Sequence, residues 1–245
     1  AGELVVARKD YFEKSRFNPL KYYIKDSAEL QAKLLKIEGV RVVTMRTDFG
    51  VMIEANEKNQ GIRTTAVDVD QFAKLSQVPE NIIAGEYLKA EGKGILIGKW
   101  VADELGLKPG DKATLLGKTV YDSFTADDFV VSGVFDMGST VANRAAYMSV
   151  SSAQEYLEME NAVSRILVFG TSYLTSEALA DRVTSAGILP EGVAIRTWRE
   201  NSFLTSIYSI VSGVRVALSV IICFVAGLGI LNMMTVSVME RRREI

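Results

Sequence analysis

The residues that most often carry enzyme chemistry are scarce in this chain. Its 245 residues contain no histidine and a single cysteine, Cys223, which lies inside an apolar segment. Without histidine, neither a Ser-His-Asp or Cys-His nucleophilic site nor an HExxH zinc site can be built. Acidic residues gather at Asp127-Asp128 and at Glu155, Glu158 and Glu160, but their spacing lacks the pattern of a calcium-binding loop. We therefore expect no catalytic residue and no metal site in this chain.

Two glycine-containing segments resemble phosphate-binding loops only in part. Gly117-Lys118-Thr119 matches the end of a P-loop, but that pattern requires glycine at position 112, where this chain has Lys112. The segment 92–98 departs from GxGxxG because its third glycine comes one residue late. Turns beside strands explain both segments better, so we expect no cofactor. The net charge of −2 provides no broad basic face, which argues against a nucleic-acid partner.

The most informative segment lies near the end of the chain. No charged side chain occurs from Val216 to Met239. These 24 residues would form a helix of roughly 36 Å, enough to cross the ~30 Å hydrocarbon core of a membrane. A lone span must satisfy its backbone hydrogen bonds internally, and only a helix does so. The sequence therefore predicts a transmembrane helix at 216–239.

The charges that follow this segment predict its direction. They are Glu240, Arg241, Arg242, Arg243 and Glu244. Under the positive-inside rule the arginine-rich end is cytoplasmic, so residues 1–197 are expected on the other side of the membrane. The first residues lack the pattern of a signal peptide. We therefore expect the chain to belong to a longer protein with a transmembrane helix upstream.

Three residues within the span suit contact with other membrane helices. Gly227 and Gly229 allow close backbone approach, and Asn232 places a polar carboxamide well inside the apolar stretch. For the two glycines, ordinary transmembrane composition is an equally good explanation. For Asn232 we favour a hydrogen bond across a helix interface over simple tolerance.

The segment before the span predicts an α+β fold. Its first part alternates strands with one helix, and a similar strand–helix–strand unit returns near the end. Between them, short strands punctuated by glycine indicate a strand-rich insert. The expected elements are strands at 21–25, 40–44, 50–55, 62–68, 112–116, 129–135, 145–150, 164–169 and 192–196, and helices at 27–37, 99–107 and 176–185. A capping box of Ser152 and Glu155 is expected to begin a further helix.

These patterns predict the following division of the chain. Residues 1–81 and 151–197 form an α/β subdomain, and 82–150 form an inserted β-rich subdomain. A stalk helix at 198–215 continues into the span at 216–239, and residues 240–245 begin a cytoplasmic region. Residues 198–242 are expected to form one long helix, because apolar residues recur at helical spacing with no strong helix breaker.

The end of the chain resembles a known family. The segment Gly229–Ile245 places an asparagine-bearing span before V-x-E-R-x-R-E-I, as at the end of the second transmembrane helix in MacB/FtsX/LolC-type ABC transporter permeases. Segments at 85–88, 95–99, 105–111 and 129–135 are similar to the outside domain of that family. The stretches Leu189–Gly192 and Thr197–Glu200 are most similar to its LolC/LolE lipoprotein-releasing branch.

This resemblance implies a four-helix permease subunit of the inner membrane with a large periplasmic domain between helices one and two. The permease would pair with a second permease subunit and with a dimer of cytoplasmic ABC ATPases, which hydrolyse the ATP. A periplasmic carrier or adaptor protein is a further implied partner. Residues 240–245 would begin the helix that contacts the ATPase. Lipoprotein release is the implied function, and the alternatives are MacB-like efflux of drugs or peptides and FtsX-like activation of a cell-wall hydrolase. A single-span receptor is the alternative outside the family.

Overall fold

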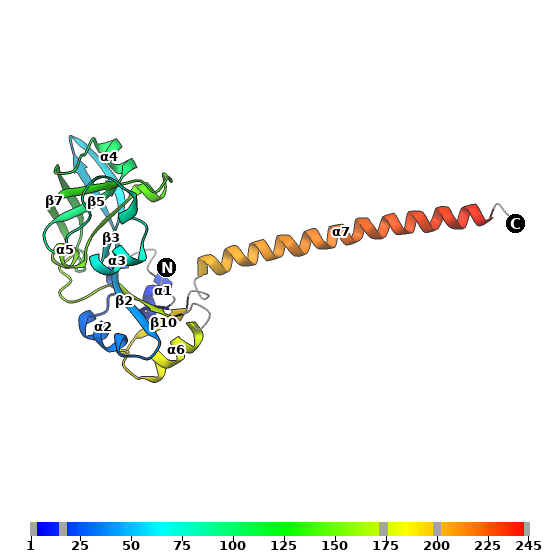
Figure 1. Cartoon of the computed structure of the whole chain (residues 1–245), viewed down its shortest axis with the longest axis horizontal. Helices are drawn as coiled ribbons and strands as arrows, with labels where there is room; N and C mark the ends of the chain where they lie inside the picture. The colour runs from blue at the N-terminus through cyan, green and yellow to red at the C-terminus, as the bar shows by residue number, and fades with distance from the viewer. Residues whose placement is uncertain (1–3, 15–18, 172–175, 198–201, 243–245) are drawn as a thin grey trace. The chain divides into compact units, whose positions relative to one another are not determined.

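The computed structural model describes residues 4–14, 19–171, 176–197 and 202–242 of the chain. These residues fall into two units, Ala1–Trp198 and Arg199–Ile245. The first unit is a mixed α+β domain, and the second is dominated by one long helix (Figure 1). The fold class predicted from the sequence is confirmed, with the strand-rich part of the domain closed into a small barrel.

One half of the domain is a four-stranded antiparallel sheet in the order β10-β1-β9-β2. Its chain order is β-α-β followed later by a second β-α-β, which is the ferredoxin-like arrangement. The elements are β1 (Leu4–Arg8), α2 (Ser27–Leu35), β2 (Val40–Ala55), β9 (Arg165–Gly170), α6 (Ser176–Ser185) and β10 (Val193–Thr197).

Helices α2 and α6 supply the apolar side chains that cover this sheet. Leu30 and Leu34 of α2 and Leu179 and Val183 of α6 are buried in one core with the sheet. Their four-residue spacing puts each pair on one face of its helix, as an amphipathic helix requires. Figure 1 shows both helices in the same part of the domain.

The other half is a closed barrel of six strands. Pairing runs from β2 to β3 (Lys58–Val67), β8 (Ala145–Ser149), β5 (Gly94–Gly98), β7 (Phe124–Phe135) and β6 (Lys112–Lys118), and from β6 back to β2. Closure leaves no free edge within the ring. Fully buried side chains fill the interior, among them Ile53, Ile95, Ile97, Leu115 and Phe129.

Short elements complete the domain. Strand β4 (Ile82–Gly85) pairs with β7 outside the ring. A second small core forms beside α3, where Val67, Phe72 and Phe135 pack together. The remaining short elements are α1 (Lys9–Lys14), η1 (Pro19–Lys21), α3 (Val69–Leu75), η2 (Pro79–Asn81), α4 (Lys99–Leu105), η3 (Ala142–Arg144) and α5 (Val150–Tyr156).

Strand β2 joins the two halves of the domain. Its residues 40–46 pair with β9, and residues 46–55 pair with β3. Two strands separated by a break were predicted here, and that prediction is wrong. The polar residues at the expected break have partners far away in the sequence. The Thr47 hydroxyl accepts a hydrogen bond from the amide of Ser164, just before β9, at 3.1 Å, and Asp48 accepts one from the Thr65 hydroxyl of β3 at 2.8 Å. Because β2 belongs to both halves, the proposed subdomain boundaries stay predictions.

Two further sequence predictions are wrong in detail. No strand forms at 21–25, where Ile24 makes only an isolated bridge with Val163. The first strand of the sheet is instead β1, whose short apolar run was not recognised. The helix at 150–156 is capped by Ser149, whose hydroxyl accepts from the Ser152 amide at 3.1 Å, and not by Ser152 as expected.

Residues 108–111 form a tight turn. The Asp111 amide donates to the Lys108 carbonyl at 3.1 Å, and Gly110 adopts φ +94°, as the third position of a type II turn requires. Because this turn leads directly into β6, it places the strand that closes the barrel.

Candidate functional site: the edge strand β10 and the apolar helix α7

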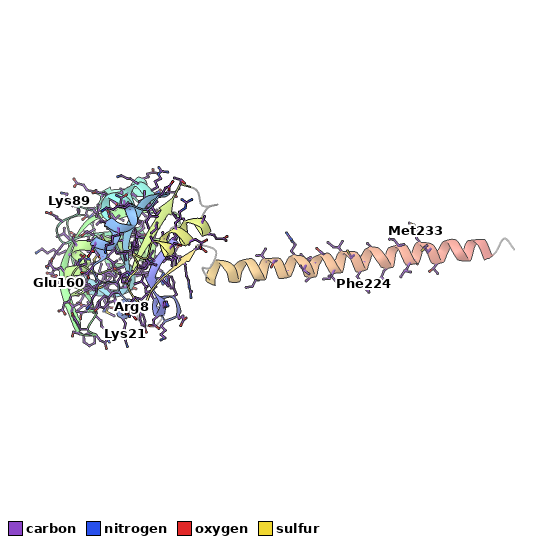
Figure 2. All side chains as sticks on the ribbon, turned by 90° about the horizontal axis from the view of Figure 1, so that it is seen from below. Arg8, Lys21, Lys89, Glu160, Phe224 and Met233 are labelled. Atoms are coloured by element: carbon purple, nitrogen blue, oxygen red, sulfur yellow. The ribbon has the colours of Figure 1, made fainter. Side chains whose placement is uncertain are left out.

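Helix α7 (Ser202–Arg242) contains a segment long and apolar enough to cross a membrane, Ile210–Thr235. It is the one such helix among the described residues. Its 26 residues span roughly 39 Å at 1.5 Å per residue. Apolar side chains extend from all sides of it, including Phe224 and Met233, which are 68% and 76% exposed (Figure 2). An apolar surface of this kind fits hydrocarbon and not water.

Two hydroxyl groups in this segment are satisfied within the helix. Ser219 donates to the Arg215 carbonyl at 2.9 Å, and Thr235 donates to the Leu231 carbonyl at 2.8 Å. Such bonds to the preceding turn allow serine and threonine to lie in lipid without another partner.

Asn232 differs, because its carboxamide makes no hydrogen bond within the described part of the chain. Gly227 and Gly229 face open space, with nothing within 4 Å of a side chain added at either position. All three predicted packing residues therefore lie on α7 with room for a neighbouring helix. Their role in helix packing stays a prediction.

The predicted coupling residues lie at the end of α7. The backbone of Glu240, Arg241 and Arg242 continues the helix, whereas Arg243 and Glu244 lie outside the described residues. Their part in membrane topology and ATPase contact stays a prediction.

Strand β10 is the last element before α7. It is an edge strand whose hydrogen-bonded neighbour is β1, through five register pairs from Leu4↔Thr197 to Arg8↔Val193. The Lys9 amide extends this ladder by donating to the Gly192 carbonyl at 2.9 Å. The first residue of β1 thus lies beside the last residue of β10. Sequence reasoning predicted β10 but missed its partner, and the short continuous apolar run Leu4–Ala7 is the signal that could have revealed it.

A polar cluster lies where the sheet meets the barrel. Arg46 and Arg165 are direct cross-strand partners, and the Asp48 carboxylate lies between them on the same face. Arg165 forms a short hydrogen bond with one Asp48 oxygen, and the Thr65 hydroxyl donates to the other. Burial raises the pKa of the nearby Tyr11 hydroxyl, and the charge of Arg165 partly offsets that rise. The cluster connects β2, β3 and β9.

Within the described residues, no group of three or more histidine, cysteine, aspartate or glutamate side chains is placed to hold a metal ion.

Comparison with known proteins identifies the domain. The model of the MacB-like periplasmic core domain matches residues 4–186. The chain belongs to this family. The matched region covers β1 through α6, and therefore includes both the barrel and most of the sheet.

Solved structures share the fold at low sequence identity. The extracellular domain of the noncanonic ABC-type transporter YknZ from Gram-positive bacteria matches with a TM-score of 0.57 at 15% identity, covering 80% of this chain and 99% of that one. The periplasmic region of MacB from Actinobacillus actinomycetemcomitans matches with a TM-score of 0.56 at 12% identity, covering 84% of this chain and 92% of that one. This MacB-like chain thus consists of an extracytoplasmic domain anchored by a C-terminal transmembrane helix.

Proposed function

We propose that this chain is part of the permease subunit of an ABC transporter that uses cytoplasmic ATP hydrolysis to drive work outside the inner membrane. The observation that carries the proposal is that the membrane helix α7 follows the ordered strand β10 closely along the chain. Four residues separate β10 from α7. Because five Cα–Cα steps join Thr197 to Ser202, the end of β10 and the start of α7 can be at most about 18 Å apart, so a larger displacement of α7 would pull on β10.

The strand pairing of the sheet would allow a displacement of β10 to pass to the rest of the domain. Five register pairs hold β10 to β1, and β1 is in turn paired with β9. Each backbone hydrogen bond contributes only about 0.5–1.5 kcal/mol net, but a load applied along a strand is shared by several of them. From β9 the load reaches β2, which continues into the barrel. The whole domain would then move as one body.

The proposed partners follow from the two ends of α7. Glu240, Arg241, Arg242, Arg243 and Glu244 would set the cytoplasmic side and begin the contact with an ABC ATPase dimer. Gly227, Gly229 and Asn232 would pack against another membrane helix of the same or a second permease subunit. ATP hydrolysis belongs to the ATPase, and we assign no catalytic residue to this chain.

For the cargo, we propose release of lipoproteins from the inner membrane to a periplasmic carrier. The support is the resemblance of Leu189–Gly192 and Thr197–Glu200 to the lipoprotein-releasing branch. Efflux of drugs or peptides is the second candidate, and the shared fold with the periplasmic region of MacB favours it. A tripartite pump would require an adaptor protein in place of a carrier.

Reconstitution distinguishes these functions. The full-length protein would be copurified with its ATPase and partner permease and placed in proteoliposomes that contain a lipoprotein. ATP-dependent transfer of the lipoprotein to an added periplasmic carrier is the expected result. ATP hydrolysis without transfer would overturn lipoprotein release while keeping the permease assignment, and the same vesicles would then be tested for efflux. A preparation in which no ATPase associates with the permease would overturn the permease assignment.

A further inference from the structure

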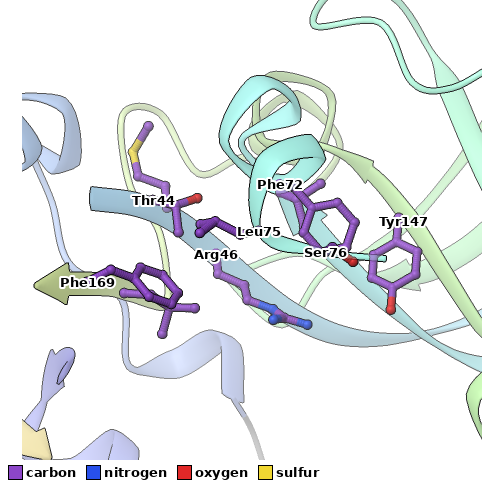
Figure 3. Close-up of a pocket in the computed structure, with 10 residues that line it drawn as sticks. Thr44, Arg46, Phe72, Leu75, Ser76, Tyr147 and Phe169 are labelled. Atoms are coloured by element: carbon purple, nitrogen blue, oxygen red, sulfur yellow. The ribbon is translucent and has the colours of Figure 1, made fainter. Parts of the chain in front are cut away.

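A hollow of about 190 Å³ lies on the face of the sheet that carries Arg46. Strands β2 and β9 form its floor, α3 lies along one side, and Tyr147 of β8 contributes from the barrel. Figure 3 shows the Arg46 side chain between the Phe169 ring and the Tyr147 hydroxyl, with Phe72 and Ser76 close by. At about 30 Å³ per water molecule, the hollow has room for roughly six water-sized groups.

The charges around the hollow do not balance. Arg46, Arg63 and Arg165 share one face of the sheet with the carboxylate of Asp48. The two oxygens of Asp48 are already engaged by Arg165 and by the Thr65 hydroxyl. Arg46 is left at 3.6 Å from the carboxylate, and its Nε has no hydrogen-bond partner among the described residues.

Neighbouring acidic groups do not neutralise this excess of positive charge. Asp68 accepts a hydrogen bond from the Gln71 amide as the cap of α3. The charges of Asp68 and Asp70 act on the Tyr87 hydroxyl, whereas the charges that act on Tyr147 are those of Arg46 and Asp48. The hollow therefore retains the positive charge of Arg46 beside a tyrosine hydroxyl that can donate a hydrogen bond.

Of the other eight lining residues, six are apolar, and Thr44 and Ser76 are polar. The Tyr147 ring packs against Phe72 at 4.9 Å and against Phe135 at 5.4 Å between ring centroids, which fixes the direction of its hydroxyl. Leu75 is 41% exposed at the rim, although it is a large apolar side chain. A guanidinium, a hydroxyl and an apolar wall are the combination that holds a ligand with an anionic head and an apolar body.

We propose that this hollow binds a small amphipathic carboxylate, with its oxygens on Arg46 and Tyr147 and its apolar group between Phe72, Leu75 and Phe169. The planar guanidinium pairs with both oxygens of a carboxylate. The volume admits one ring or a short alkyl chain beyond the head group, so a longer chain would extend past the rim at Leu75. The proposal is independent of the cargo that the transporter moves.

The test uses the full chain in lipid nanodiscs and isothermal titration calorimetry with 3-phenylpropionate. Empty nanodiscs correct for partition of the probe into lipid. The expected result is saturable binding of one molecule per chain. The neutral amide, 3-phenylpropionamide, is expected to bind at least tenfold more weakly, because it lacks the charge that pairs with Arg46. Inorganic phosphate, which lacks the apolar group, is also expected to bind more weakly.

Variants locate the site. Arg46→Met keeps the apolar stem and removes the charge, and it is expected to weaken binding of the carboxylate about tenfold or more. Arg46→Lys should weaken binding less than Arg46→Met, since lysine keeps the positive charge but cannot pair with both carboxylate oxygens as the planar guanidinium does. Arg41→Met is the matched control, because Arg41 is an exposed arginine on the same strand. Unfolding midpoints establish that each variant is folded. Equal binding of acid and amide, unchanged binding by folded Arg46→Met, or no saturable binding would overturn the proposal.

Discussion

The Asp48 carboxylate is expected to contribute strongly to the stability of the extracytoplasmic domain. Replacing it by asparagine keeps the side-chain size and an acceptor for the Thr65 hydroxyl, but it removes the charge between Arg46 and Arg165. At 3.6 Å, attraction to Arg46 alone amounts to roughly 4–5 kcal/mol for an effective dielectric constant of 20. Desolvation offsets part of this gain, and the two arginines would then face each other uncompensated. We expect Asp48→Asn to lower the free energy of unfolding by about 2–3 kcal/mol.

Urea unfolding of the full chain in detergent, followed by tryptophan fluorescence, measures this loss. Asp128→Asn is the matched control, because Asp128 also accepts from a cross-strand threonine, Thr114, at 2.7 Å but is exposed. It should change stability by less than about 0.5 kcal/mol. Arg165→Met should cost less in the Asp48→Asn background than in the original chain. The reasoning would be refuted if Asp48→Asn and Asp128→Asn lowered the free energy of unfolding equally. It would also be refuted if the effects of Asp48→Asn and Arg165→Met were strictly additive.

Three further predictions concern the core, the alkaline limit and the end of α7. In Gly98→Ala the new methyl group would lie 2.2 Å from the Asn143 carbonyl oxygen, so we expect urea unfolding to show a free energy of unfolding lower by about 2 kcal/mol or more. Gly61→Ala is the control, because nothing lies within 4 Å of its new methyl group and its stability should hardly change. Burial raises the pKa of Tyr87 from 10.0 to about 12. The unfolded tyrosine therefore loses its proton first, so stability should fall as pH rises above 10, and Tyr87→Phe should reduce this slope in urea midpoints measured across that range. Changing residues 241–243 from arginine to glutamate in the full-length protein should abolish ATPase copurification or invert the span, and normal assembly with normal orientation would contradict the assigned role.

Much of the fold follows from local patterns in the sequence. Helices at 99–107 and 176–185 and strands at 50–55 and 62–68 were predicted, because apolar spacing and glycine positions act over a few residues; in the structure the first of these helices ends at Leu105. The apolar helix was the clearest prediction of all, since its composition alone excludes an aqueous surface.

The parts that could not be predicted depend on contacts distant in sequence. Closure of the barrel requires β6 to pair with β2, about 60 positions earlier in the chain, and no local pattern encodes that partner. The continuity of β2 depends on polar residues such as Asp48, whose partner Arg165 is 117 positions away. From the neighbouring sequence alone, the polar residues Arg46–Asp48 indicate the end of a strand, because the residues that pair with them lie far away in the chain.

The hollow at Arg46 was missed for the same reason. Its lining comes from β2, α3, β8 and β9, and helix α3 was not predicted from the sequence. By contrast, Gly227, Gly229 and Asn232 were identified from the sequence of the span itself. Small and polar side chains stand out among large apolar ones, and no partner residue is needed to find them.

The central claim is that motion of α7 is transmitted through β10 to the extracytoplasmic domain. The most direct test inserts a flexible Gly/Ser-rich linker after Thr197 in the full-length protein and measures ATP-dependent lipoprotein release in proteoliposomes. The matched control carries the same linker at Asp122, in the exposed turn between β6 and β7. We predict that the first insertion abolishes release while ATP hydrolysis and copurification with the ATPase persist, and that the control insertion leaves release intact. Undiminished release with the linker after Thr197 would contradict mechanical transmission through this junction.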